Sequence, residues 1–335
     1  MLCYLFSVII NPVIAQQKPH YTQYLMNQYI INPALTGIEN YTDIKLSHRH
    51  QWVGIMDAPV TTYFTIHKAI HKSDTRTTPT SFEVPVENPR GRQYWKEYEA
   101  PAPHHGIGMQ IINDRTGPLN RFSGLLTYAY HMALTQRTSI AAGISAGVTN
   151  ISINASKLEF YSPIDPAVFG SGVLNNFRPD VNLGLYLYSA DYFLGVSALQ
   201  IYPQKINFSD GSVTETKSGK SVPHIFVTGG YRFMIGDNWN IIPSIMLKYV
   251  QPLPVQFDLN TRLAYRDRFW FGVGGRLDDG FSAMAGMNIS HTVNIGYSYD
   301  YNTSRYYNYS KGTHEILLGF TISKQLGFAC PRNVW

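Results

Sequence analysis

The chain has 335 residues, of which 15% are charged and 14% are aromatic, and its formal net charge is +5. Lys and Arg do not gather into a stripe, so the sequence gives no support for nucleic-acid binding. No apolar run reaches the roughly 18 residues that a membrane-spanning helix needs, so no such helix is expected. Apolar residues instead alternate with polar ones, and closed all-β structures of this length commonly form one domain.

Residues 1–15 form an apolar stretch ending in VIA, which suits signal-peptidase cleavage before Gln16. The basic residues that normally precede such a stretch are missing, so either the true start lies upstream or the signal is weak. A buried N-terminal strand is the alternative interpretation. Removing residues 1–15 takes away Cys3 and leaves Cys330 alone, so no intramolecular disulfide is expected, and neither cysteine has zinc-site spacing.

Residues 16–40 carry no clean helical or strand period. Their middle, 24–31, is compatible with a short helix that ends at Asn32-Pro33, because proline disfavours helical geometry in the residue before it. A segment of this kind could lie under or inside a barrel as a plug, and the sequence is equally compatible with an extended tail.

Two strands are predicted next, at 42–52 and 60–70, from alternating apolar and polar residues. His48 and His50 share a face of the first strand, a spacing that supplies two metal ligands, but no third ligand is near and no metal site is expected. An irregular insertion follows at 71–105, rich in Pro, Thr and charge. Its last two residues are the histidine pair 104–105, which we expect to be exposed in a loop.

Beyond the insertion the alternation hardly stops. Near the C-terminus, for example, apolar and aromatic residues occupy every second position of 293–301, and small or polar residues occupy the positions between them. The remaining predicted strands are 106–113, 120–134, 138–152, 178–189, 192–202, 222–235, 239–250, 255–265, 269–277, 281–290, 292–301 and 314–323. With the first two they make about 14, each near the roughly ten residues of a tilted membrane strand.

The links between these strands carry a second signal. Successive links alternate between the two ends of an antiparallel barrel. The links at one end are tight, for example 136–137, 190–191 and 266–267, whereas longer links such as 153–177 and 302–313 all belong to the other end. Outer-membrane barrels have short periplasmic turns, longer external loops and usually an even strand number. We therefore predict an all-β fold, a transmembrane outer-membrane antiparallel β-barrel over 41–328, with residues 16–40 as an N-terminal periplasmic or plug segment and 329–335 as a tail. The insertion at 71–105 is the exception, a long link on the periplasmic side.

Charged residues occur on the polar faces of the predicted strands and are expected to point into the barrel lumen. They are Arg49, Arg232, Lys248, Asp258, Arg262, Arg276, Asp300 and Glu315. Mixed charge inside a barrel most simply means a paired, hydrated or plugged interior, and the alternatives are a selective channel or an active site. The sequence contains no Gly-x-Ser-x-Gly, phosphate-binding glycine loop or HExxH motif, so we expect no enzyme and no cofactor.

Several local sequences resemble one known family. YTQYLMNQYIINPALTG followed by RHQWVGIMDAP resembles the opening signature of the PorP/SprF family, and GIGMQIINDRTGPLNRF, RPDVNLGLYLY, IGYSYDY and GTHEILLGF resemble later blocks. The resemblance spans roughly residues 20–332. Fifteen positions match the family signature, and we carry them over as candidates for partner contact. They are Gln23, Tyr24, Asn32, Pro33, Gly37, Arg49, Gln51, Trp52, Asn113, Asp114, Gly117, Tyr299, Asp300, His314 and Glu315.

The resemblance implies an outer-membrane component of the type IX secretion and gliding machinery of Bacteroidetes. It implies contacts with outer-membrane lipid, with periplasmic ring or motor components, and with large adhesins whose export or surface localisation the protein supports. The alternatives are an outer-membrane channel or porin for small solutes, and a barrel enzyme that uses lumenal carboxylates such as Asp300 and Glu315.

Overall fold

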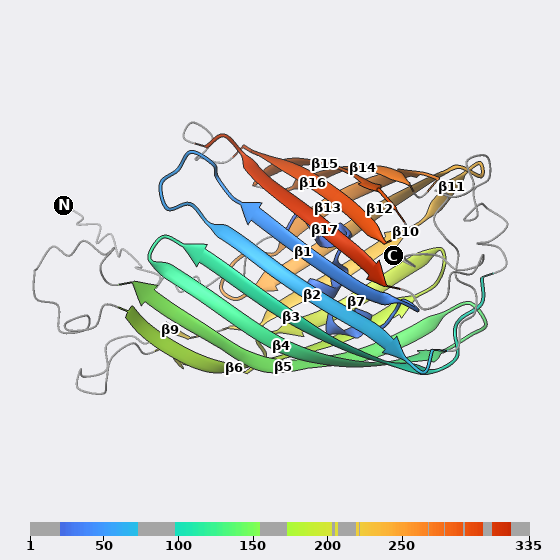
Figure 1. The fold of residues 1–335 in the computed structure, drawn as a ribbon, viewed down its shortest axis with the longest axis horizontal. Helices are drawn as coiled ribbons and strands as arrows, with labels where there is room; N and C mark the ends of the chain where they lie inside the picture. The colour runs from blue at the N-terminus through green and yellow to red at the C-terminus, as the bar shows by residue number, and fades with distance from the viewer. Residues whose placement is uncertain are drawn as a thin grey trace, which may run out of the picture.

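The protein is a closed antiparallel β-barrel in the computed structural model (Figure 1). The structure describes residues 21–72, 98–154, 173–202, 205–206, 219–220, 222–266, 268–277, 279–290, 292–303 and 310–322. The candidate signal peptide, most of the insertion and the tail lie outside these residues. No helix in the described part of the chain is both long and apolar enough to cross a membrane.

The barrel wall is one sheet of neighbouring strands that follow chain order. The strands are β1 (Thr42–His50), β2 (Val60–Ile70), β3 (His104–Thr116), β4 (Leu119–Ala133), β5 (Ser139–Asn154), β6 (Val173–Tyr188), β7 (Tyr192–Leu199), β10 (His224–Tyr231), β11 (Phe233–Ile235), β12 (Trp239–Val250), β13 (Gln256–Tyr265), β14 (Phe269–Arg276), β15 (Gly280–Asn288), β16 (Val293–Asn302) and β17 (Thr313–Ile322). The short strands β8 (Lys205–Ile206) and β9 (Gly219–Lys220) pair only with each other.

The first and last strands close the wall. β1 pairs antiparallel with β17, and the register places Arg49 opposite Glu315. β10 and β11 both pair with β12, so they form one interrupted wall strand, and the wall has 14 strands in all. The predicted fold class and strand number are confirmed. Closure leaves no sheet edge exposed to lipid, which satisfies the backbone hydrogen bonds inside a membrane.

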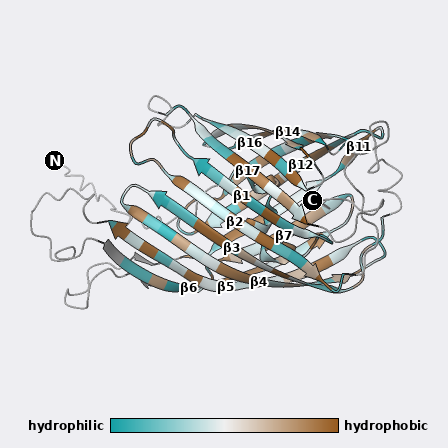
Figure 2. Ribbon diagram, in the orientation of Figure 1, coloured by the Kyte–Doolittle hydropathy of each residue, from teal (hydrophilic) through white to brown (hydrophobic). Residues whose placement is uncertain are grey.

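The alternating sequence produces an apolar outer face and a polar lumen. In β16, Tyr297 and Tyr301 are exposed on the outside, whereas Ser298 and Asp300 are buried inside. Figure 2 shows hydrophobic and hydrophilic residues alternating along the strands. The outward residues are the apolar and aromatic ones that face lipid in a membrane barrel.

Strand ends differ from the prediction at two informative places. Trp52 is not part of β1, because its backbone φ of 51° is left-handed and ends the strand two residues earlier. The histidine pair expected in an exposed loop is the start of β3 instead, and His104 is fully buried. The reason is that the His104 ring reaches a carbonyl oxygen inside the barrel, as described below.

Successive antiparallel strands give the barrel two distinct ends. One, which we call the turn end, carries the tight links at 134–138, 189–191, 236–238, 266–268 and 289–292, together with the insertion between β2 and β3. The other, the loop end, carries the links at 51–59, 117–118, 155–172, 200–223, 251–255, 277–279 and 303–312. β1 starts at the turn end and β17 finishes there.

Residues 21–41 lie inside the barrel, and we call them the lumenal segment (Figure 1). They form three single-turn 3-10 helices, η1 (Gln23–Leu25), η2 (Gln28–Ile30) and η3 (Pro33–Leu35). A single helix over 24–31 does not form, because Asn27, with φ −144° and ψ 64°, has a non-helical backbone and interrupts it. η3 begins where Pro33 follows Asn32, whose side chain accepts a hydrogen bond from Ala34 N–H at 2.9 Å.

Candidate functional site

Hydrogen bonds join the middle of the lumenal segment to the wall from several directions. Its Tyr29 carbonyl accepts from Gln110 of β3 at 2.9 Å, and its Ile31 carbonyl accepts from Ser197 of β7 at 2.5 Å. The Asn32 amide donates to the Leu185 carbonyl of β6 at 3.0 Å. Side chains of β3 and β7 therefore satisfy backbone carbonyls that would otherwise be buried without partners.

Apolar side chains fill the space between these bonds. Tyr24, Leu25, Ile30 and Ile31 form one buried cluster with inward-facing wall residues, which include Phe226, Met246, Trp270 and Leu317. Burial raises the pKa of the Tyr29 phenol to about 12, so it stays neutral, and its hydroxyl donates to Thr127 at 2.9 Å. The lumenal segment is thus packed as a core.

Three inward-facing glycines, which we call the glycine track, lie where the lumenal segment touches the wall. A Cβ atom on Gly106 of β3 would lie 1.8 Å from the Thr36 carbonyl oxygen, and one on Gly184 of β6 would lie 2.0 Å from Asn32 Oδ1. A Cβ on Gly143 of β5 would lie 2.5 Å from Ala34 N. Such contacts are sterically forbidden, so only glycine fits at these three positions.

At the turn end, histidines hold the backbone of the lumenal segment. His67 Nδ1 accepts from Gly37 N–H at 3.2 Å, and His104 Nε2 lies 3.1 Å from the Gly37 carbonyl oxygen. His131 Nε2 lies 2.8 Å from the Thr36 carbonyl oxygen, and its ring stacks on His104 with centroids 4.6 Å apart. Gly37 itself has φ +78°, a left-handed backbone that favours glycine.

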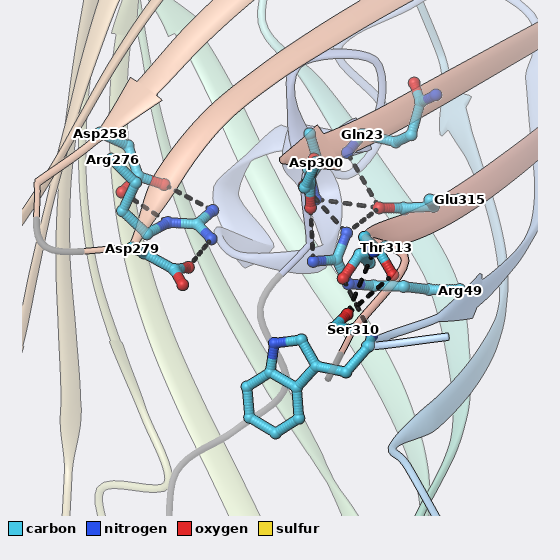
Figure 3. Close-up of polar contacts among 12 residues, drawn as sticks. Gln23, Arg49, Asp258, Arg276, Asp279, Asp300, Ser310, Thr313 and Glu315 are labelled. Atoms are coloured by element: carbon cyan, nitrogen blue, oxygen red, sulfur yellow. Dashed lines mark hydrogen bonds and ion pairs between the residues drawn. The ribbon is translucent and has the colours of Figure 1, made fainter. Parts of the chain in front are cut away.

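At the loop end, charged side chains hold the start of the lumenal segment, in an arrangement we call the ionic network (Figure 3). Arg49 Nη2 lies 2.7 Å from Asp300 Oδ2, and its Nη1 lies 3.1 Å from Glu315 Oε2. Glu315 also accepts from the backbone N–H groups of Thr22 and Gln23, at 2.9 and 3.3 Å. The Thr22 hydroxyl donates to Asp300 at 2.7 Å.

A second ionic group lies on β13, on β14 and in the link after β14, and is also drawn in Figure 3. Arg276 donates through Nε to Asp258 Oδ1 at 3.0 Å and through Nη1 to Asp279 at 2.8 Å. These residues, with Thr22, line a small cavity between the lumenal segment and β13–β16. Arginine is well suited to such paired contacts because its donors form a fixed fork.

The other predicted lumenal charges are placed separately. Arg262 contacts the Met26 sulfur of the lumenal segment at 3.3 Å, and Lys248 is buried on β12. Arg232, between β10 and β11, donates to the Ala190 carbonyl at the turn end at 3.1 Å. Each points into the barrel, and none belongs to the ionic network.

The signature positions divide into three groups. Gln23, Tyr24, Asn32, Pro33 and Gly37 belong to the lumenal segment. Arg49, Asp300 and Glu315 form the ionic network.

The third group lies at the loop end, on the barrel wall and its links. It comprises Gln51, Trp52, Asn113, Asp114, Gly117, Tyr299 and His314. The structure connects several of them across strands: Trp52 N–H donates to Thr313 Oγ1 at 3.1 Å, and Asp114 accepts from Thr61 at 2.7 Å. The rings of Tyr299 and His314 pack 5.1 Å apart.

The glycine track and the histidines at the turn end were missed by sequence reasoning. One sequence feature could have indicated them. Gly106, Gly143 and Gly184 lie at inward-facing positions of their strands, where a polar or bulky residue is expected. Within the described residues no group of three or more His, Cys, Asp or Glu is arranged to hold a metal ion. His48 bonds instead to Thr62 on the outer face, at 2.9 Å.

Comparison with solved structures finds barrels of low sequence identity. The CymD monoaromatic hydrocarbon channel is 11% identical, with 92% of this chain and 94% of that chain covered and a TM-score of 0.49. A Pseudomonas aeruginosa FadL homologue is 9% identical, with 88% and 93% covered and a TM-score of 0.46. Acinetobacter baumannii Omp33 is 8% identical, with 85% and 99% covered and a TM-score of 0.43. No curated protein matches the chain.

Comparison with protein families gives a match over most of the chain. The family described as type IX secretion system membrane protein PorP/SprF matches residues 13–320. The range includes the whole lumenal segment, the ionic network and nearly all of the barrel wall. The protein therefore belongs to the PorP/SprF family of type IX secretion system membrane proteins, and it is a β-barrel of the outer membrane.

Proposed function

We propose that the protein is a closed, non-enzymatic scaffold that contacts periplasmic secretion components and supports the export or surface localisation of adhesin-like substrates. The observation that carries the proposal is the filled lumen. The lumenal segment is bonded to the wall at the loop end by the ionic network and at the turn end by histidines. A barrel packed in this way serves as a platform more readily than as a pore.

Conductance in a planar bilayer separates the scaffold from a channel for small solutes. We expect little current from the full-length protein, and a large increase from a variant that lacks residues 21–36. Heat-modifiable migration on a gel is the control that both proteins have folded and inserted. Porin-like current from the full-length protein would show that the scaffold proposal is wrong and that the barrel is a channel.

The candidate catalytic carboxylates are used for structure. Asp300 accepts from Arg49 and Thr22, and Glu315 accepts from Arg49 and from two backbone N–H groups. These contacts support a structural role for both carboxylates.

The turn end is the proposed contact surface for periplasmic components, because short turns face the periplasm in outer-membrane barrels. The insertion enters and leaves at this end. Lys72 donates to the Ile38 carbonyl at 2.6 Å and His104 bonds to Gly37, so both must be retained in any deletion.

The test is therefore a variant in which a short Gly-Ser linker replaces 74–96, with a matched linker in place of 157–170 at the loop end as its control. We expect the first variant to lose co-purification with periplasmic type IX components and the second to keep it. If both variants co-purify as well as the unaltered protein, the insertion has no part in partner binding.

A further inference from the structure

Lys68 of β2 places a charge on the face of the wall that otherwise carries apolar residues. Thr65 and His67 are buried on the inward face of β2, whereas Lys68 is exposed on the outward face. Among Asp, Glu, Lys and Arg, only Lys68 and Arg115 lie on the outward faces of the described wall strands, and Arg115 is at the loop-end tip of β3. A charge on the lipid face is costly except near the membrane interface, so its place is a candidate for function.

The position of Lys68 along the wall is close to the turn end. β2 ends two residues later, at Ile70. Across the neighbouring strands, Lys68 is opposite Ile107 of β3, and Ile107 is opposite Tyr128 of β4. Tyr128 and Tyr130 are exposed on the outer face, and tyrosines near strand ends mark the level of the lipid headgroups. A lysine at this depth lays its aliphatic stem along the wall and extends its ammonium group into the headgroup region.

His105 of β3 supplies a second hydrogen-bond donor beside Lys68. It lies two residues nearer to the turn end than Ile107, so it is a diagonal neighbour of Lys68 and within reach of a long side chain. Its ring packs against Tyr128 and Tyr130, with centroids 5.9 and 5.1 Å apart, and its Nδ1 lies 2.7 Å from the Tyr128 hydroxyl. When this hydroxyl donates to Nδ1, the neutral ring carries its hydrogen on Nε2 and can donate it to a ligand.

Two donors on the outer face of adjacent strands, one of them positively charged, suit an anionic group at the headgroup level. In a membrane this group is the phosphate of a phospholipid, which lysine binds as a point charge. Ile107 and Tyr130 are exposed beside the two donors and offer apolar surface to the acyl chains of the same lipid. We propose that Lys68 and His105 form a binding site for the phosphate of a phospholipid in the periplasmic leaflet. The site lies outside the lumen and is independent of the proposed scaffold role.

The test measures thermal unfolding of the full-length protein in a phosphate-free detergent while dioleoylphosphatidylglycerol is added, with dioleoylglycerol as the chain-matched lipid without phosphate. We expect the Tm to rise saturably with the phospholipid and to rise less with dioleoylglycerol. In Lys68→Met the apparent affinity for the phospholipid falls at least about tenfold, because a charge-assisted hydrogen bond is lost. Arg137→Gln removes an exposed arginine elsewhere at the turn end, so it is the matched control and keeps the full response.

Further variants separate the two donors. His105→Phe keeps a ring against Tyr128 and Tyr130 and removes the Nε2 donor, so we expect a smaller loss of affinity than in Lys68→Met. Lys68→Arg keeps the charge and most of the response. Methionine suits a lipid-facing position, so without lipid the Tm of Lys68→Met should equal or exceed that of the unaltered protein.

Three results would overturn the proposal. The first is a response of Lys68→Met to the phospholipid that equals the response of the unaltered protein. The second is a full rise in Tm with dioleoylglycerol or with inorganic phosphate, since neither combines a phosphate with acyl chains. The third is a lower Tm of Lys68→Met in the absence of lipid, which would assign Lys68 a partner within the protein.

Discussion

The two ends of the lumenal segment are held by different chemistry. At the loop end, Arg49, Asp300 and Glu315 hold Thr22 with charged side chains. At the turn end, the backbone of Thr36 and Gly37 is held by hydrogen bonds with histidine rings, and Gly106 leaves room for it to touch the wall. One end depends on charges that must stay paired, and the other depends on the absence of a side chain.

This difference predicts which changes the barrel tolerates. A buried ion pair adds little net stability compared with apolar residues of the same size, but removing one partner leaves the other buried and unpaired. A glycine at a backbone contact has no such partner, and any larger residue displaces the lumenal segment itself. The four predictions below test the two ends and the middle of the segment, from the largest effect to the smallest.

The largest effect is expected from Arg49→Met. It leaves Asp300 and Glu315 buried beside each other without a positive charge, which costs roughly 3–5 kcal/mol of unfolding free energy. Urea titration of the detergent-solubilised barrel, followed by heat-modifiable migration, measures the loss.

The control for the charged end is the triple variant Arg49→Met with Asp300→Asn and Glu315→Gln. Its amides keep an oxygen that accepts from Thr22, while the uncompensated charge is gone. We expect it to be more stable than Arg49→Met alone. If the triple variant is the less stable of the two, the network is held by more than charge pairing.

Gly106→Ala tests the turn end. The added Cβ would meet the Thr36 carbonyl oxygen at 1.8 Å, and overpacking of this kind costs up to roughly 3 kcal/mol. Gly124→Ala is the matched control, because a Cβ there meets nothing within 4 Å. We expect a lower unfolding free energy and a rise in bilayer conductance for the first variant only. Equal behaviour of the two alanine variants would contradict the close contact between Gly106 and the lumenal segment.

The period of the strands made the wall predictable from sequence. The aromatic Tyr297 and the small polar Ser298 follow the alternation that a lipid-facing strand requires. In the structure Tyr297 faces outward and Ser298 faces the lumen. The same alternation puts Arg49, Asp300 and Glu315 on the polar face. Their association was not predictable, because Arg49 is 251 and 266 residues away from its partners and only closure of the barrel brings β1 beside β17.

The lumenal segment was not predictable for a different reason. A residue pattern of period 2 or 3.6 arises when one side of an element faces the core and the other faces solvent. Tyr24, Gln28, Tyr29 and Asn32 are all buried, because the wall surrounds the segment. A chain enclosed on every side has no polar face, so it leaves no period in the sequence.

Asn32→Ala is expected to have an intermediate effect. The change removes the acceptor for Ala34 N–H and the donor to the Leu185 carbonyl, and such bonds contribute about 1 kcal/mol each, or roughly 2 kcal/mol together. Asn32→Asp keeps the acceptor but places a buried, unpaired carboxylate against the Leu185 carbonyl oxygen, so its loss of unfolding free energy should exceed that of alanine. If alanine costs nothing, the start of η3 is set by Pro33 alone.

The smallest effect is expected where a charged pair is exposed to water. Arg137 and Asp191 lie 3.5 Å apart at the turn end, with 46% and 37% of their side chains exposed. Solvent and salt screen such pairs, so Arg137→Gln should change the unfolding free energy by less than about 0.5 kcal/mol. Arg49→Met should keep its large cost when the salt concentration rises, since its carboxylates are buried. A large cost for Arg137→Gln would mean that this end of the barrel is also held by charge, and the contrast between the two ends would be lost.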